Sequence, residues 1–151
     1  MPGGEVEGGS ATARGGRVSQ LRLAVTAADH DQALRFYRDV LGMPEVGTFA
    51  GPEGGRVTIL DAGRATLELS DPPYAAYIDE VEVGRRVAGP IRVAFEVADA
   101  AAATDAAAAA GARVLAPPTT TPWNSLNARL NGPAGLQLTL FSDLDDGAPA
   151  G

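Results

Sequence analysis

The stretches Gln20-Leu-Arg-Leu-Ala-Val25 and Ile91-Arg-Val-Ala-Phe-Glu-Val97 decide the fold. In both, apolar residues alternate with other residues, which is typical of a strand with one face on a core. An offset of 72 positions aligns Gln20 with Arg92, and the same offset aligns the ends of the two stretches. The chain therefore contains a repeated unit that begins with a half-buried strand.

Each of these strands is followed by a helix signal. Asp29 with Gln32 three residues later forms a capping-box pattern, apolar residues follow at helical spacing, and Gly42 suits the end of the helix. Asp99 begins an alanine-rich run that Gly111 ends. The sequence thus predicts one helix after each of the two strands.

Glycine- and proline-bounded segments after each helix predict further strands. We expect them at residues 45–48, 56–61 and 65–70 in the first repeat, with a short helix at 75–80, and at 113–115, 125–131 and 136–141 in the second. This order predicts an α+β fold of two tandem β-α-β-β-β modules, about 18–71 and 90–144, forming an open, mixed-sheet, barrel-like cleft.

The predicted strands have one apolar and one polar face. We expect the apolar face to pack on the helices; it comprises Leu21, Leu23, Val25, Leu67, Leu69, Val93, Phe95, Val97, Leu136, Leu138 and Leu140. If the modules curl, the opposite face lines a concave cleft; its side chains are Gln20, Arg22, Thr66, Glu68, Arg92, Glu96, Ser125, Asn127, Arg129, Asn131, Gln137 and Thr139. The alternative is that this face simply meets water.

Composition limits the possible functions. The 151 residues fit one domain, at 18–144, between glycine-rich residues 1–17 and acidic, Gly/Ala/Pro-rich residues 145–151, which we expect to be flexible tails. The chain has no cysteine, no lysine and one histidine, which excludes thiolate and Schiff-base chemistry and a multi-histidine metal site. Its net charge of −7 argues against nucleic acid, and the sequence contains neither a membrane-spanning run nor a signal peptide. We therefore expect a cytoplasmic protein.

The segment Phe36-Tyr-Arg-Asp-Val-Leu-Gly-Met43, after the first strand, resembles the opening of the vicinal oxygen chelate superfamily, which includes glyoxalases, bleomycin-resistance proteins and extradiol dioxygenases. Residues 92–99 and the turn Gly132-Pro-Ala-Gly135 resemble the corresponding strand and closing turn of the second module. The resemblance implies a cleft built within one chain or across a homodimer, and we expect a homodimer. The abundance of Ala, Gly and Arg suggests a GC-rich bacterial genome.

Enzymes of this superfamily hold a divalent metal on the inner sheet face, and the resemblance places the ligand positions at Gln20, Glu68, Arg92 and Thr139. Arg92 has only donors and stays protonated, so it puts a positive charge where the cation would lie. Thr139 is a weak ligand. We therefore predict no bound metal and no cofactor, with Arg92 paired to Glu68 across the cleft.

Our leading hypothesis is a metal-free domain that binds a small aromatic or amphipathic molecule, as bleomycin-resistance proteins do. Trp123, the only tryptophan, could stack on a planar ligand while Asn124, Asn127 and Arg129 make polar contacts. Equally, Trp123 could pack at a sheet edge or against a dimer partner. Gln20, Arg22, Glu68, Arg92 and Thr139 complete the candidate binding residues.

Two other hypotheses remain open. The protein could be a lyase, isomerase or dioxygenase of the same superfamily, either metal-independent, with Glu68 as general base and Arg92 stabilising an oxyanion, or with a non-standard metal site. It could also be a structural or regulatory protein with a vestigial cleft. We expect His30 at an exposed helix start and the Tyr37 hydroxyl at the surface; the acidic run is expected to be solvated and comprises Asp79, Glu80 and Glu82.

The substitution Arg92→His tests the placement of the four positions. It replaces a fixed positive charge with an imidazole that carries a lone pair, so it should create affinity for Zn²⁺ or Ni²⁺ if Gln20 and Glu68 share the site. Calorimetric titration of the variant and the parent protein measures this. Equal, negligible metal binding by both would contradict the placement.

Overall fold

The structure is a computed structural model that describes residues 20, 22–66, 68 and 70–144. The described residues divide into two compact units: 20, 22–25, 62–66 and 68 belong to the first, and 26–61 and 70–144 belong to the second. All helices and strands of the described residues lie in the second unit. The tails expected at 1–17 and 145–151 lie outside the described residues.

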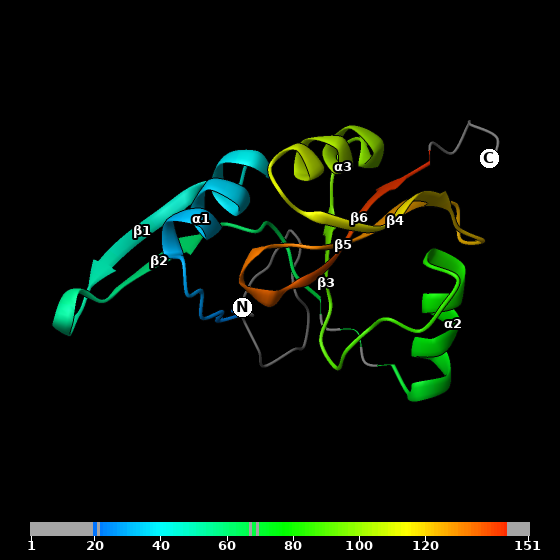
Figure 1. Ribbon diagram of the computed structural model, residues 1–151, viewed down its shortest axis with the longest axis horizontal. Helices are drawn as coiled ribbons and strands as arrows, with labels where there is room; N and C mark the ends of the chain where they lie inside the picture. Colours follow the sequence, from blue (N-terminus) through cyan, green and yellow to red (C-terminus); the bar gives the residue numbers. More distant parts are fainter. Residues whose placement is uncertain (1–19, 21, 67, 69, 145–151) are drawn as a thin grey trace. The chain divides into compact units, whose positions relative to one another are not determined.

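The second module has the expected β-α-β-β-β order (Figure 1). Its sheet runs in the order β3-β6-β5-β4, with β3 parallel to β6 and the other neighbours antiparallel. This arrangement confirms the α+β fold class. The elements are β3 (Val93–Glu96), α3 (Ala100–Ala109), β4 (Arg113–Thr120), β5 (Ser125–Asn131), the short 3-10 turn η3 (Pro133–Gly135) and β6 (Gln137–Asp143).

The first module is less regular than predicted. Asp29 caps α1 (His30–Leu34) by accepting a hydrogen bond from the Gln32 amide at 3.0 Å, and the helix continues as a π-helical segment, η1 (Arg35–Val40). Its first residue, His30, is half-buried. A hairpin follows, formed by β1 (Glu45–Ala50) and β2 (Arg56–Leu60) around η2 (Pro52–Gly54). The helix expected at 75–80 is longer, α2 (Pro72–Glu82), because Asp71 caps it and proline suits its first turn.

The prediction of strands at 20–25 and 65–70 is wrong. None of the described residues in these two ranges lies in a strand. Leu23 and Val25, expected to pack on a helix, are 52% and 41% exposed. Alternation specifies which face a strand would bury, but a strand also needs a neighbouring backbone to satisfy its amides and carbonyls. Leu21, Leu67 and Leu69 lie outside the described residues.

The hydrophobic core lies on one face of the four-stranded sheet, under α3 and the first helix. Tyr37 is 8% exposed, and its hydroxyl donates to the Pro133 carbonyl at 2.8 Å. The expectation that this hydroxyl lies at the surface is therefore wrong. A Cβ at Gly132 would lie 2.9 Å from the Tyr37 hydroxyl, so the closing turn needs glycine there. The buried core residues are Phe36, Tyr37, Ala107, Ala128, Leu130, Leu138 and Leu140.

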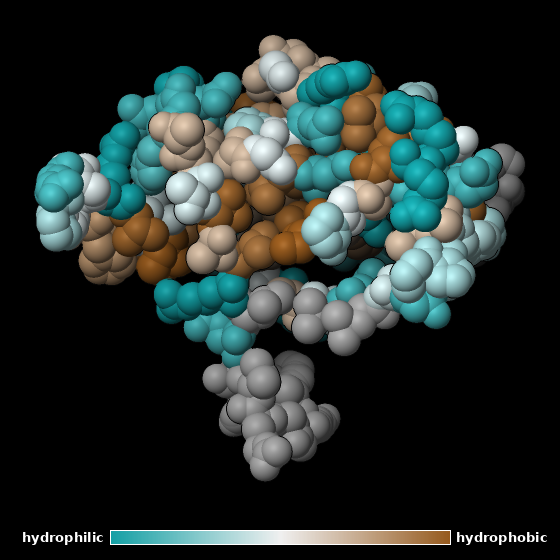
Figure 2. Space-filling model, turned by 60° about the horizontal axis from the view of Figure 1, so that its bottom comes forward, coloured by the Kyte–Doolittle hydropathy of each residue, from teal (hydrophilic) through white to brown (hydrophobic). Residues whose placement is uncertain are grey.

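The β1–β2 hairpin exposes apolar side chains, visible as brown spheres at the left of Figure 2. Val46, Phe49 and Val57 are 67%, 59% and 54% exposed. Among the described residues, no helix is long and apolar enough to cross a bilayer.

Tyr37→Phe removes the hydrogen bond between helix and closing turn, and should lower the free energy of unfolding by about 0.5–1.5 kcal/mol. Burial raises the pKa of Tyr37 from 10.0 to about 12. The folded protein thus keeps a proton that the unfolded chain releases, so the contribution of Tyr37 to stability is present below pH 10 and is lost as pH rises towards 12. Denaturant unfolding at neutral and alkaline pH measures both effects.

Tyr77→Phe is the matched control, because Tyr77 is 44% exposed and its ring lies outside the hydrophobic core. Equal stability of Tyr37→Phe and the parent protein would contradict the assigned role of the hydroxyl.

Candidate functional site

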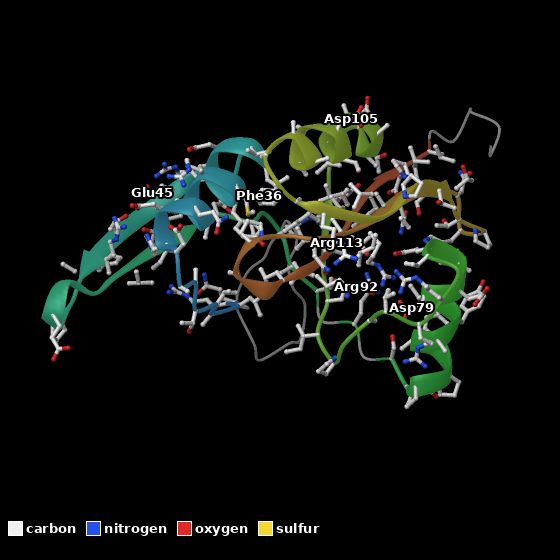
Figure 3. The ribbon with its side chains drawn as sticks, viewed as in Figure 1. Phe36, Glu45, Asp79, Arg92, Asp105 and Arg113 are labelled. Atoms are coloured by element: carbon white, nitrogen blue, oxygen red, sulfur yellow. The ribbon has the colours of Figure 1, made fainter. Side chains whose placement is uncertain are left out.

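Two carboxylates of α2 lie on the polar face of the sheet. Asp79 and Glu82 are three residues apart and therefore share one side of the helix. Asp79 is 0% exposed and Glu82 is 4% exposed. In Figure 3, Asp79 lies on the side of α2 that faces the strands. The expectation that Asp79 and Glu82 are solvated is wrong, whereas Glu80 between them is exposed as expected.

Arg129 of β5 binds both carboxylates. Its Nη1 donates to Asp79 Oδ1 at 2.7 Å, while Nε and Nη2 donate to Glu82 Oε1 at 3.1 and 2.9 Å. Nη1 also donates to Gln137 Oε1 at 2.9 Å. The Arg129 side chain has no solvent exposure, so these acceptors take the place of water around a charge that cannot be neutralised by deprotonation.

The loop after α2 supplies the remaining hydrogen-bond donors to Asp79. The amides of Val87 and Ala88 donate to Asp79 Oδ2 at 2.9 and 3.0 Å, and Arg86 Nε lies 3.4 Å from the same oxygen. Burial alone would raise the pKa of Asp79. The Ala88 amide, the Arg129 guanidinium and the Val87 amide outweigh burial, and the pKa lies below its ordinary value.

A chain of hydrogen bonds continues along the sheet from Glu82. Thr139 Oγ1 donates to Glu82 Oε1 at 3.2 Å and accepts from Arg92 Nη1 at 2.7 Å. Asn127 Nδ2 donates to Glu82 Oε2 at 2.8 Å, and Ser125 Oγ donates to Asn127 Oδ1 at 2.6 Å. The sheet face therefore carries one connected polar network, most of it buried.

The structure brings some of the predicted site residues together. Arg92, Asn127, Arg129 and Thr139 all join this network, as their shared sheet face predicts. Asn124 lies at the β4–β5 turn with a φ of +68°, a conformation that asparagine tolerates.

Three further predicted residues belong to the first compact unit. Gln20, Arg22 and Glu68 are exposed, and Arg22 Nε donates to Gln20 Oε1 at 3.3 Å. Their place in a shared cleft, and the pair between Arg92 and Glu68, stay predictions.

An exposed aromatic cluster lies beside the network. Tyr74 and Tyr77 of α2 have ring centroids 5.7 Å apart, and Tyr77 lies 6.3 Å from Trp123. The three side chains are 53%, 44% and 42% exposed. We call these residues the aromatic cluster. The sequence indicated Trp123 but missed the two tyrosines. The predicted helix, 75–80, contains Tyr77 but not Tyr74, and only the longer α2 places both on one side of a helix.

The side chains of the second module do not fit a divalent cation. Thr139 Oγ1 already accepts from Arg92 and donates to Glu82, and both nearby carboxylates of α2 are bound to Arg129. Arginine nitrogens offer no lone pair to a metal. In the part of the chain that the structure describes, no three His, Cys, Asp or Glu side chains gather where they could hold an ion.

These features define an α+β fold with a polar sheet face. The sequence profile of the Glyoxalase/Bleomycin resistance protein/Dioxygenase superfamily matches residues 19–140, and the chain belongs to this superfamily. No curated protein matches the chain.

Solved structures share the fold at low identity. A glyoxalase-related enzyme from Fulvimarina pelagi is 18% identical over 89% of this chain and 98% of its own, with a TM-score of 0.52. A glyoxalase family protein from Bacillus cereus is 16% identical over 88% and 100%, with a TM-score of 0.51. TioX from Micromonospora sp. ML1 is 19% identical over 88% and 99%, with a TM-score of 0.51. At such identities these likenesses concern the fold.

Asp79→Asn should lower the free energy of unfolding at pH 7 by about 3–5 kcal/mol, because it removes one partner of a buried ion pair. The lowered pKa means that the contribution of Asp79 to stability is present above the ordinary pKa of 3.8 and is lost as pH falls through the lowered value. The difference in free energy of unfolding between variant and parent should therefore be smaller at acidic pH than at pH 7, as measured by denaturant unfolding. Glu80→Gln is the control, and a cost for Asp79→Asn that is no larger than for this variant would contradict the role of the pair.

Proposed function

We propose that the protein is a non-catalytic, metal-free binding domain for a small aromatic or amphipathic molecule. The aromatic cluster carries this proposal. Large aromatic side chains are usually buried or covered by a partner, whereas the rings of Tyr74, Tyr77 and Trp123 lie together and open to solvent. A planar ligand would bury several faces at once.

Polar groups beside the rings would orient such a ligand. Asn124 follows Trp123 directly, and its Oδ1 is buried without a hydrogen-bond partner among the described residues. The combination of stacking surface and a few polar contacts is typical of small-molecule sites. Superfamily membership supports the proposal at the level of fold. A homodimer in the cytoplasm of a bacterium remains part of the proposal.

Trp123 offers a direct test, because it is the only tryptophan of the chain. Excitation at a wavelength selective for tryptophan reports on the aromatic cluster alone. Titration with a panel of planar natural products should change its emission saturably for one compound class. The same compound should stabilise the fold by about 2.7 kcal/mol at 100 times its dissociation constant.

Trp123→Ala should weaken binding of that compound about tenfold or more, measured by calorimetry because the variant lacks the fluorophore. Phe49→Ala is the matched control, since Phe49 is an aromatic residue of similar exposure on the hairpin. A panel without any saturable response, or unchanged affinity in Trp123→Ala, would contradict the proposal. Turnover of the compound that falls about 10²-fold or more in Glu68→Gln would favour the enzyme instead.

A further inference from the structure

The Glu82 carboxylate is held as a bound ligand would be. Arg129 Nε, Arg129 Nη2 and Thr139 Oγ1 donate to Oε1, and Asn127 Nδ2 donates to Oε2. All three donor residues lie on the sheet, whereas Glu82 is the last residue of α2. From this geometry we infer that the sheet face is a binding site for a small carboxylate, which Glu82 fills from within the chain and from which an external carboxylate displaces it.

The donors of the site do not depend on Glu82. Arg129 and Asn127 belong to β5 and Thr139 belongs to β6, two strands paired in register over seven residue pairs from Ser125↔Asp143 to Asn131↔Gln137. The Thr139 hydroxyl is further held by Arg92. Since Arg129 stays charged at any usable pH, the face attracts an anion whenever Glu82 leaves it.

The contacts of α2 favour such an exchange. Asp79 and Glu82 are its only buried residues among those described, so the helix is attached through ionic groups more than through apolar ones. Replacing one carboxylate with another preserves the charge balance of Arg129, whereas leaving the arginine alone costs several kcal/mol. The chain after α2, residues 83–92, contains neither helix nor strand, so the exchange needs only the last turn of α2 to open.

Asp79 need not move in this exchange. Its Oδ2 is held by the amides of Val87 and Ala88, and its Oδ1 still balances part of the Arg129 charge. The incoming group therefore replaces a single carboxylate. One of its oxygens would accept three hydrogen bonds, and the other would accept one. Because a carboxylate fills this pattern in the structure, a carboxylate is the expected replacement. None of its three donor residues, Arg129, Asn127 and Thr139, belongs to the aromatic cluster.

The first experiment is chemical rescue. Glu82→Ala should lower the melting temperature by about 10 °C, and formate, acetate or propionate should restore part of this loss saturably. Chloride at equal ionic strength should not. Glu80→Ala is the matched control on the exposed side of the same helix. An equal effect of acetate on both variants, or the absence of any rescue, would overturn the inference.

The second experiment uses the unmodified chain, so it stands even if Glu82→Ala fails to fold. Succinate should accelerate hydrogen exchange of the amides at the end of α2 saturably, while exchange in β5 and β6 stays unchanged. Unchanged exchange in α2 would show that Glu82 is only a structural contact, and would overturn the inference even if rescue succeeds. Inorganic phosphate acting as strongly as succinate would overturn the assignment to carboxylates. Neither result depends on Trp123, so each is independent of the proposed aromatic site.

Discussion

A buried guanidinium constrains how the second module is assembled. Arg129 has no solvent exposure and cannot lose its charge, so its neighbours must supply acceptors. Asp79 and Glu82 supply them from α2, a helix that lies outside the β-α-β-β-β repeat. The position of α2 on the sheet follows from this requirement more than from apolar packing, which the structure reserves for α3 and the opposite face.

The same interaction supports the proposal that this chain, unlike metal-binding members of its superfamily, holds no metal. There, carboxylate and imidazole ligands surround a cation on the inner face. Here, the fixed positive charge of Arg129 lies on the polar face of the sheet and is paired with two carboxylates. Arg129 thus supplies the positive charge to which Asp79 and Glu82 bind, and the polar side chains around it already make hydrogen bonds within this network.

Much of the second module could be predicted from its sequence, because period-two strands, an aspartate cap at Asp99 and a closing glycine turn all agree there. The polar face of β5 and β6 was predictable for the same reason. The burial of Asp79 and Glu82 was not, since an acidic run on a helix gives no sign of the arginine that it meets 47 or 50 residues later. The described residues of 20–25 show a different limit. Their alternating pattern is typical of a strand, but it does not show whether another strand lies next to it.

The most direct test is the metal content of the purified, untagged protein, measured by elemental analysis alongside protein concentration. The account predicts no stoichiometric divalent metal, because Arg129 and Arg92 occupy the sheet face and the α2 carboxylates are committed to Arg129. One equivalent of zinc, iron, manganese or nickel per chain would contradict it, and would show that the guanidinium groups leave room for a cation.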